Sequence, residues 1–249
     1  MRHFDDDGPI LINMLIDQYY TKANSKVTFT RQQASDFAKK ISDDFNPLHN
    51  TDSKRFCVPG DLLFSMVLAN YGANSHMQFN FSGMVTDDVH LNLPDDSPLL
   101  TINGDNGKEY LTIERSGETS TNSVLIDNLT RSYVTFSGHT FPHILVPLLE
   151  QQQVMINPDR PIVMYQSMLI DLDRLDLVDV ELTLDSEKTS ISVNGKRGNV
   201  CLAFHLIAND KVIGRGEKHM VVSGLKPFEK VVVDQIIDDY NQWKSAFNA

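Results

Sequence analysis

The chain has 249 residues, of which 41% are hydrophobic, and it carries a formal net charge of -11. This length can bury a large core, either in one large domain or in two domains of about 110 to 130 residues each, and we expect two. The acidic balance argues against a nucleic-acid partner, because binding to nucleic acid depends on lysine and arginine contacts to phosphates.

The cysteines and the N-terminal region indicate the compartment. The two cysteines, Cys57 and Cys201, lie far apart in apolar surroundings, which is typical of reduced core thiols and not of a disulfide framework. The expected leader, residues 1–25, lacks the basic start of a signal peptide, and its apolar run at 10–16 is far shorter than a membrane span. We therefore expect a cytoplasmic protein with no membrane partner.

A first folded half is expected over residues 26–137. A strand at 26–30 precedes a helix that runs to Ile41, and Thr30 followed by Gln33 indicates a capping box at its start. A second helix at 60–72 is almost wholly apolar, so we expect it to lie buried at the centre. Alternating stretches separated by turn residues then predict antiparallel strands at 77–81, 89–93, 99–102, 110–114 and 124–136.

The same order is expected to recur over residues 138–225. An apolar helix is predicted at 141–153, followed by strands at 163–170, 178–184, 190–193, 199–208 and 212–222. Helical spacing over 231–247 predicts a C-terminal helix, within residues 226–249, that packs across the outside. A helix under a curved antiparallel sheet, twice over, makes an α+β chain whose halves share one continuous sheet or interface.

The most informative motif follows the first predicted helix, where Asp44 and His49 flank an Asn46-Pro47 step. Pro47 forbids continuation of the helix and pushes Asn46 towards extended geometry. The loop can therefore hold a carboxylate and an imidazole, the groups of general acid–base catalysis, near one bound molecule. The alternative is a capped surface loop whose polar side chains satisfy local N–H groups.

Two strings, at 44–49 and 58–65, resemble the MaoC-like, (R)-specific enoyl-CoA hydratases of the hotdog superfamily. The resemblance covers roughly residues 26–75; the rest agrees in the order of strands and helices. More narrowly, these strings are similar to an uncharacterised proteobacterial family related to the hydratases, which has no assigned activity. The resemblance implies a double hotdog fold, in which each half is a curved antiparallel sheet wrapped around a central helix, and a place in fatty-acid metabolism.

The resemblance also implies roles for five residues. The positions of Asp44 and His49 match the pair that activates a water for addition to C3 of an enoyl thioester and returns a proton to C2. Asn46 matches a residue that shapes the loop and helps place the ligand. Gly60 matches the glycine whose backbone N–H receives the thioester carbonyl, at a helix N-terminus that favours negative charge. Ser65 matches a serine that can orient the catalytic carboxylate.

Two positions depart from the pattern of that family. Asp43 stands where the hydratases usually have glycine, and if it pointed inward beside Asp44, repulsion would raise the pKa of one carboxyl group. Pro59 stands where they usually have histidine, a change that leaves the N–H of Gly60 in place. Asp61 adds a further negative charge at the start of this helix.

Basic residues at two places could meet the phosphates of coenzyme A. Lys54 and Arg55 lie between the loop and the central helix, and a second pair lies at 196–197 in a predicted turn. The alternative is that these residues are ordinary solvated charges. For Lys54 and Arg55 this alternative has equal weight, and for the pair at 196–197 it is the more usual outcome.

Several functions lack their defining residues. The chain has no GxGxxG, Walker, HExxH or GxSxG motif, which argues against nicotinamide enzymes, nucleoside triphosphatases, zinc proteases and serine hydrolases. His139 and His143 have helical spacing but no supporting ligand, so we expect no metal site. No cofactor is expected beyond an acyl-CoA or acyl-carrier thioester as substrate.

Three functions remain open. The first is an acyl-thioester lyase, a hydratase or dehydratase that acts on an enoyl chain. The second is thioester hydrolysis on the same scaffold. The third is a non-catalytic protein that binds an acyl thioester or a protein partner. Two hotdog halves in one chain would allow a monomer, and a homodimer is the alternative.

Overall fold

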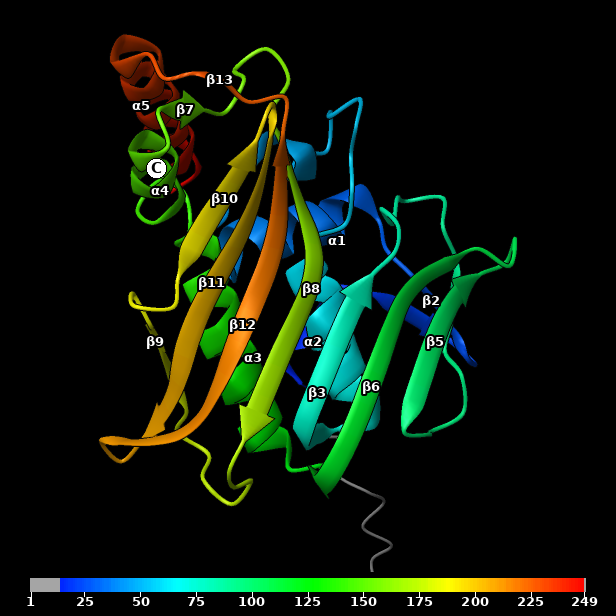
Figure 1. Cartoon of the computed structure of the whole chain (residues 1–249). Coiled ribbons are helices and arrows are strands. Elements are labelled where there is room, and N and C mark those ends of the chain that lie inside the picture. The colour runs from blue at the N-terminus through cyan, green and yellow to red at the C-terminus, as the bar shows by residue number, and fades with distance from the viewer. Residues whose placement is uncertain (1–13, 249) are drawn as a thin grey trace, which may run out of the picture.

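The computed structural model describes residues 14–248, so residues 1–13 of the expected leader lie outside the described residues. One 11-stranded sheet runs through both halves of the chain, and its pairings are antiparallel (Figure 1). The strand order is β1-β2-β4-β5-β6-β3-β8-β12-β11-β10, with β9 paired to β11. The prediction of one continuous sheet is therefore confirmed.

The first half matches the predicted order of elements. It consists of η1 (Leu15–Gln18), β1 (Thr21–Ala23), β2 (Lys26–Thr28), α1 (Arg31–Lys40), η2 (Pro47–His49), α2 (Gly60–Tyr71), β3 (Ala73–Phe81), β4 (Leu91–Asn92), β5 (Leu99–Gly104) and β6 (Glu109–Ser120). The predicted capping box of α1 is present, because the Thr30 hydroxyl accepts the N–H of Gln33 and the Gln33 side chain accepts the N–H of Thr30.

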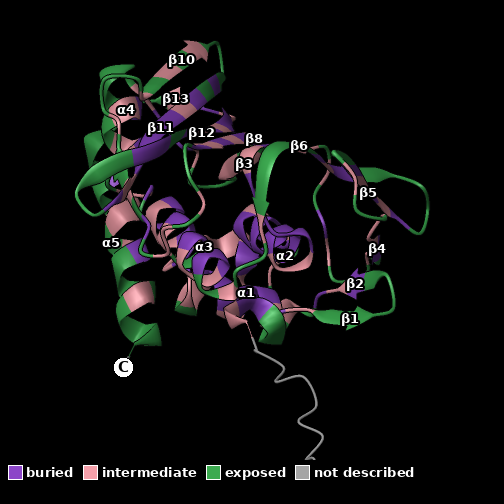
Figure 2. Ribbon diagram, turned by 90° about the horizontal axis from the view of Figure 1, so that it is seen from below, coloured by how far each residue is buried: buried purple, intermediate pink, exposed green. Residues whose placement is uncertain are grey.

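Helix α2 is the central helix of this half, as predicted. It is apolar on all sides, and Leu62, Phe64, Met66 and Leu68 are each 0% exposed. A helix with this pattern needs cover all round. In Figure 2 it lies beneath the sheet, close to α1 and α3.

The second half carries the predicted strands but a different helix. Its elements are α3 (Ser123–Gly138), α4 (Leu145–Gln151), β7 (Val154–Met155), β8 (Ile162–Leu172), β9 (Glu181–Leu184), β10 (Ser190–Asn194), β11 (Arg197–Ala208), β12 (Lys211–Ser223), β13 (Lys226–Pro227) and α5 (Lys230–Phe247). The predicted C-terminal helix is thus confirmed as α5. None of the helices in residues 14–248 is long and apolar enough to cross a membrane.

Two predictions for the region between the halves are wrong. The stretch 124–136 is not a strand but most of α3, which begins after Asn122 and buries Leu125, Leu129 and Tyr133 at helical spacing. The stretch 141–153 forms only the short helix α4, outside the main core. α3 is the second central helix: it packs against α2, with the rings of Phe64 and Tyr133 4.6 Å apart.

The two halves share one core as well as one sheet. They join where β3 pairs with β8, in a register that sets His76 opposite Asp171. The main apolar cluster contains buried residues from both halves, including Phe79 and Phe204. The two halves of this one antiparallel sheet, each covering a central helix, make this a double hotdog fold. The division of the chain after residue 137 stays a prediction. Helix α3 ends at this boundary but contacts β9 of the second half, so it is grouped with that half.

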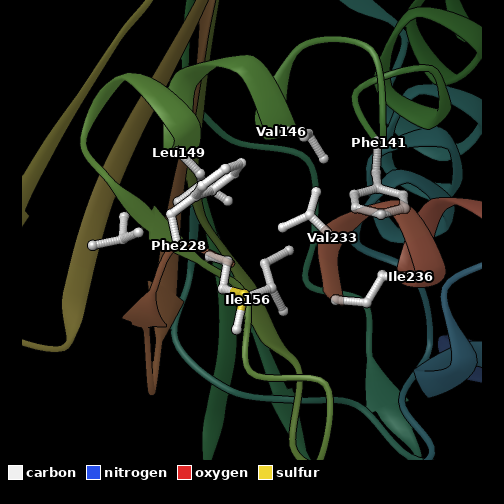
Figure 3. Close-up of a pocket in the computed structure, with 9 residues that line it drawn as sticks. Phe141, Val146, Leu149, Ile156, Phe228, Val233 and Ile236 are labelled. Carbon is white, nitrogen blue, oxygen red and sulfur yellow. The ribbon is translucent and has the colours of Figure 1, made fainter. Parts of the chain in front are cut away.

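Helices α4 and α5 pack together at one end of the second half. Apolar side chains from both helices, among them Leu149 and Val233, face a small cavity of about 10 Å³ (Figure 3). This space holds no more than about one water molecule. It is therefore a packing feature, through which α5 is held against the body of the protein.

Candidate active site

The loop after α1 is shaped by backbone hydrogen bonds that end the helix. The N–H groups of Ser42 and Asp44 bond to the carbonyls of Phe37 and Ala38, at 3.1 and 2.8 Å. Between them Asp43 adopts a φ of 55°, a left-handed conformation that glycine enters freely and that aspartate tolerates. This conformation explains why an aspartate can stand where the resembling hydratases have glycine.

The carboxylate of Asp43 is engaged by basic groups outside the cavity. It accepts a hydrogen bond from His139 Nε2 at 3.1 Å and pairs with Lys244 on α5. Asp43 is not among the residues that line the pocket described below. The second carboxylate is thus neutralised outside the site, and it does not oppose Asp44 within it.

Asp44 and His49 face each other. One carboxylate oxygen of Asp44 accepts the N–H of Asn46 at 2.9 Å, and the other lies 3.7 Å from His49 Nε2. His49 Nδ1 lies 2.8 Å from the carbonyl oxygen of Cys57. Because a carbonyl can only accept, Nδ1 carries a proton and Nε2 is the atom directed at the carboxylate.

The surroundings shift the pKa values of both Asp44 and His49. Burial raises the pKa of Asp44, against the His49 charge and the Asn46 N–H, which lower it. Burial lowers the pKa of His49, but the contacts with Cys57 and the Asp44 charge outweigh it and raise the pKa to about 9. At neutral pH, His49 is therefore an imidazolium that can donate a proton, beside a carboxyl group whose pKa is moved towards the range of a general base.

A cavity of about 480 Å³ opens beside this pair. It is lined by four of the residues singled out from the sequence, namely Asp44, Asn46, His49 and Gly60. Asn46 shapes the loop, because its side-chain oxygen accepts the N–H of Leu48 at 3.1 Å. Apolar side chains from both halves form much of the wall, including Leu63, Phe81, Val85, Met164 and Met220.

Gly60 begins α2 at the wall of this cavity. A Cβ atom here would lie 2.8 Å from Cδ2 of Tyr165, so the position needs a glycine while that ring stays in place. The preceding residue, Pro59, supplies no side-chain cap. Among the hydrogen bonds of the described residues, none uses the N–H of Gly60. This N–H is one of the free donors with which a helix begins.

Three predicted site residues are not brought to the cavity. The hydroxyl of Ser65 donates to the carbonyl of Asp61 at 2.6 Å, one turn back on α2, and does not reach Asp44. Lys54 and Arg55 are exposed and do not line the cavity. Of the basic residues considered for a carrier, Arg197 is the one that lines it.

Helix α5 holds the loop in place from outside. The hydroxyl of Tyr240 accepts the N–H of Phe45 at 3.2 Å and donates to the carbonyl of Asp43 at 3.3 Å. The ring of Phe45 meets those of Tyr240 and Phe247 edge-on, at 6.0 and 5.6 Å. Tyr240 and Trp243 also line the cavity. The last helix is thus part of the site, which its sequence did not indicate.

A buried polar cluster joins the two halves, and its members Lys218 and Ser137 were missed by the sequence analysis. Lys218 on β12 donates to the hydroxyl of Ser137, which in turn donates to Asp61 at 2.5 Å. All three line the cavity. One signal was available in the sequence: Lys218 falls on the same face of its strand as the apolar Met220 and Val222, where alternation predicts burial.

Potential metal ligands lie elsewhere. Cys201, Glu217 and His219 each place one ligand atom within 4.8 Å of the others. His219 Nε2 lies 3.0 Å from the Glu217 carboxylate, so an ordinary hydrogen bond accounts for the grouping. His139 is engaged by Asp43 and is not part of it.

The protein is a double hotdog protein in which the loop that carries Asp44 and His49 lies beside a central helix. The chain belongs to the family described as "Protein of unknown function (DUF3581)", whose model matches residues 14–231. A comparison with curated protein sequences found no match.

Solved structures with similar coordinates are of low sequence identity. A protein described as a thioesterase II from Thermobifida fusca YX has a TM-score of 0.44 and 7% identity, over 84% of this chain and 98% of its own. An acyl-CoA thioesterase II from Mycobacterium marinum has 0.40 and 9%, over 68% and 91%. An N-terminal dehydratase from the difficidin assembly line has 0.37 and 9%, over 75% and 90%. At these scores the similarities carry no conclusion about activity.

Proposed function

We propose that this protein is an acyl-thioester lyase of the MaoC-like type, which hydrates an enoyl thioester or dehydrates the corresponding 3-hydroxyacyl thioester. The observation that carries the proposal is the 3.7 Å approach of Asp44 to His49 at the wall of a largely apolar cavity that also contains the start of α2. An apolar cavity with a few convergent polar groups is the usual form of a small-molecule site.

The geometry supports a complete addition of water. Asp44 accepts a proton from water as the water oxygen bonds to C3, the C2–C3 double bond opens, and His49 donates its proton to C2. The N–H of Gly60 receives the carbonyl oxygen as it becomes enolate-like. Afterwards the proton on Asp44 returns to His49, which it faces directly. The reaction needs water and the thioester and no further cofactor.

The carrier would be coenzyme A or a similar pantetheine carrier. Arg197 is exposed and lines the cavity, so it can meet a carrier phosphate there. Lys54 and Arg55 do not line the cavity and cannot take this role. A monomer, with a homodimer as the alternative, stays a prediction.

Thioester hydrolysis is a second candidate on the same residues. The Asp44 side chain is 27% exposed, against 10% for His49, so it can also direct a water molecule at a carbonyl carbon held by Gly60. Hydrolysis releases a free thiol, whereas hydration leaves the thioester intact.

The test compares wild type with Asp44→Asn on crotonyl-coenzyme A. Loss of the enoyl-thioester absorbance without thiol release reports hydration, whereas thiol release, detected with a thiol reagent, reports hydrolysis. We expect hydration that falls by about 10²–10⁴-fold in Asp44→Asn, the usual contribution of a general base. Asp52→Asn, an exposed carboxylate near the same loop, is the control and should keep full activity. Thiol release that matches the loss of absorbance would move the assignment to hydrolysis, and binding with neither reaction would favour a non-catalytic protein.

A further inference from the structure

Lys218 is a buried cation that the acid–base pair does not account for. It lies on β12, is 5% exposed and lines the same cavity as Asp44. Lysine is rarely buried to this degree unless its charge is paired. A buried charge is also costly without a direct partner.

The neighbours of Lys218 orient its ammonium group but do not use all of its hydrogen-bond donors. It donates one hydrogen bond, to Ser137, and its Nζ lies 3.8 Å from Oδ1 of Asp61, beyond hydrogen-bonding distance. That Oδ1 atom is buried and has no hydrogen-bond partner, while the other oxygen of Asp61 is held by Ser137. An ammonium group has three donors, so Lys218 keeps donors that are free to meet a molecule in the cavity.

Tyr165 places Lys218 close to the start of α2. Its ring lies 2.8 Å from the position that a Cβ of Gly60 would occupy. The Nζ atom of Lys218 lies 4.1 Å from the centre of the same ring. The Lys218 cation from the second half and the backbone at Gly60 from the first half therefore lie against the same aromatic ring.

We propose that Lys218 is a further catalytic residue, whose ammonium donates a hydrogen bond to the thioester carbonyl oxygen as negative charge develops there. Gly60 supplies the other donor, and Asp61 and Ser137 are positioning residues for Lys218. The inference rests on the proposed function but applies to either reaction, because hydration passes through an enolate-like oxygen and hydrolysis through a tetrahedral one. In hydration the enolate electron pair moves back to C2, which takes the proton of His49. In hydrolysis the tetrahedral oxyanion collapses to the carbonyl and expels the thiolate, so Lys218 keeps its proton in both reactions.

The charges around Lys218 affect its pKa, so the pH dependence of the rate can test the proposal. Burial lowers its pKa, and Asp61 on α2 and Asp44 on the loop oppose this effect. Tyr165 on β8 is the titratable group beneath it. The wild-type rate should fall on the alkaline side as His49 and Lys218 lose their protons. Lys218→Arg should remove the part of that fall that belongs to Lys218 and leave the part that belongs to His49.

The experiment measures kcat and KM on crotonyl-coenzyme A and butyryl-coenzyme A for Lys218→Met and Lys218→Arg. We expect a loss in kcat of about 10²-fold in Lys218→Met, as for removal of one oxyanion donor, with KM changed less than about threefold, because the interaction strengthens in the transition state. Lys218→Arg should recover part of the loss. Lys211→Met, an exposed lysine on the same strand, should behave as wild type.

Removal of Lys218 alone leaves Asp61 buried and unpaired, so Asp61→Asn with Lys218→Met is the second variant. It removes both charges and should fold while showing the same loss in kcat. Wild-type kcat in either variant would overturn the role of Lys218 and leave the proposed function standing. A wild type that turns over neither thioester would overturn both.

Discussion

The two halves of the chain follow one plan but turn opposite helix ends to the cavity. Helix α2 begins there with Gly60, whereas α3 ends there with Ser137 and Gly138. A helix start offers free N–H groups and the positive end of the helix dipole, and a helix end offers carbonyls and the negative end. Of the two central helices, α2 is therefore the one that can stabilise an anionic oxygen in this cavity.

The starts of the two central helices differ in their caps. Pro59, before α2, makes no side-chain cap. Asn122, before α3, accepts the N–H groups of Val124 and Leu125 at 2.9 and 3.4 Å. The open start can take a ligand, and the closed start already has its donors satisfied. Repetition of the fold thus does not repeat the site, which needs an open helix start and an acid–base loop beside it.

The largest expected effect lies where the end of α3 meets the loop. A Cβ on Gly138 would lie 1.5 Å from the carbonyl oxygen of Ser42, a backbone atom. We predict that Gly138→Ala lowers the free energy of unfolding by about 3 kcal/mol or more, at the upper end for overpacking. Denaturant unfolding measures it.

Gly60→Ala is the matched variant at the start of α2, because its clash is with the Tyr165 side chain. A ring can shift where a backbone carbonyl cannot, so the loss should be smaller, about 1–2 kcal/mol. An equal loss in both variants, or a larger one in Gly60→Ala, would show that the two helix ends are not packed as the comparison requires.

The acid–base loop of the first half should make stability depend on pH. His49 has a pKa of about 9 in the folded protein, above its unfolded value of about 6.5. Its stabilising contribution is therefore complete below pH 6.5, falls as pH rises, and is lost above pH 9. The raised pKa of Asp44 acts in the same direction.

At about 1.4 kcal/mol per pKa unit, the rise from about 6.5 to about 9 makes the loss from His49 about 3–4 kcal/mol. His49→Gln should flatten the dependence between pH 6.5 and 9, as measured by unfolding at fixed ionic strength. His143→Gln, at an exposed histidine of the second half, should leave it unchanged. A wild type that grows more stable from pH 6.5 to 9 would contradict the pairing of His49 with Asp44.

Local patterns predicted the strands of both halves and the central helix of the first, but not the central helix of the second. The apolar run of α2, bracketed by glycines, predicts a buried helix without a competing interpretation. The stretch that became α3 is rich in valine, threonine and aromatic residues, which favour strands in isolation, and packing against α2 decides the outcome. A cap signal was present, since Asn122 directly precedes Ser123.

The site divides in the same way. Asp44, Asn46, His49 and Gly60 lie in two neighbouring strings, so their meeting could be predicted from local sequence. Lys218 reaches the cavity through the register of β12 with β8, and Tyr240 through the docking of α5. Neither contact follows from spacing along the chain, because long-range strand pairing and helix docking determine both.

The smallest predicted effect tests the closed start of α3. Asn122→Ala removes the cap on Val124 and Leu125 and should lower the free energy of unfolding by about 1 kcal/mol, the typical value for an N-cap. Because α3 presents its other end to the cavity, kcat and KM on crotonyl-coenzyme A should equal those of wild type. A variant that unfolds normally but loses turnover would place a second working site at the start of α3. The two halves would then differ in sequence but not in role.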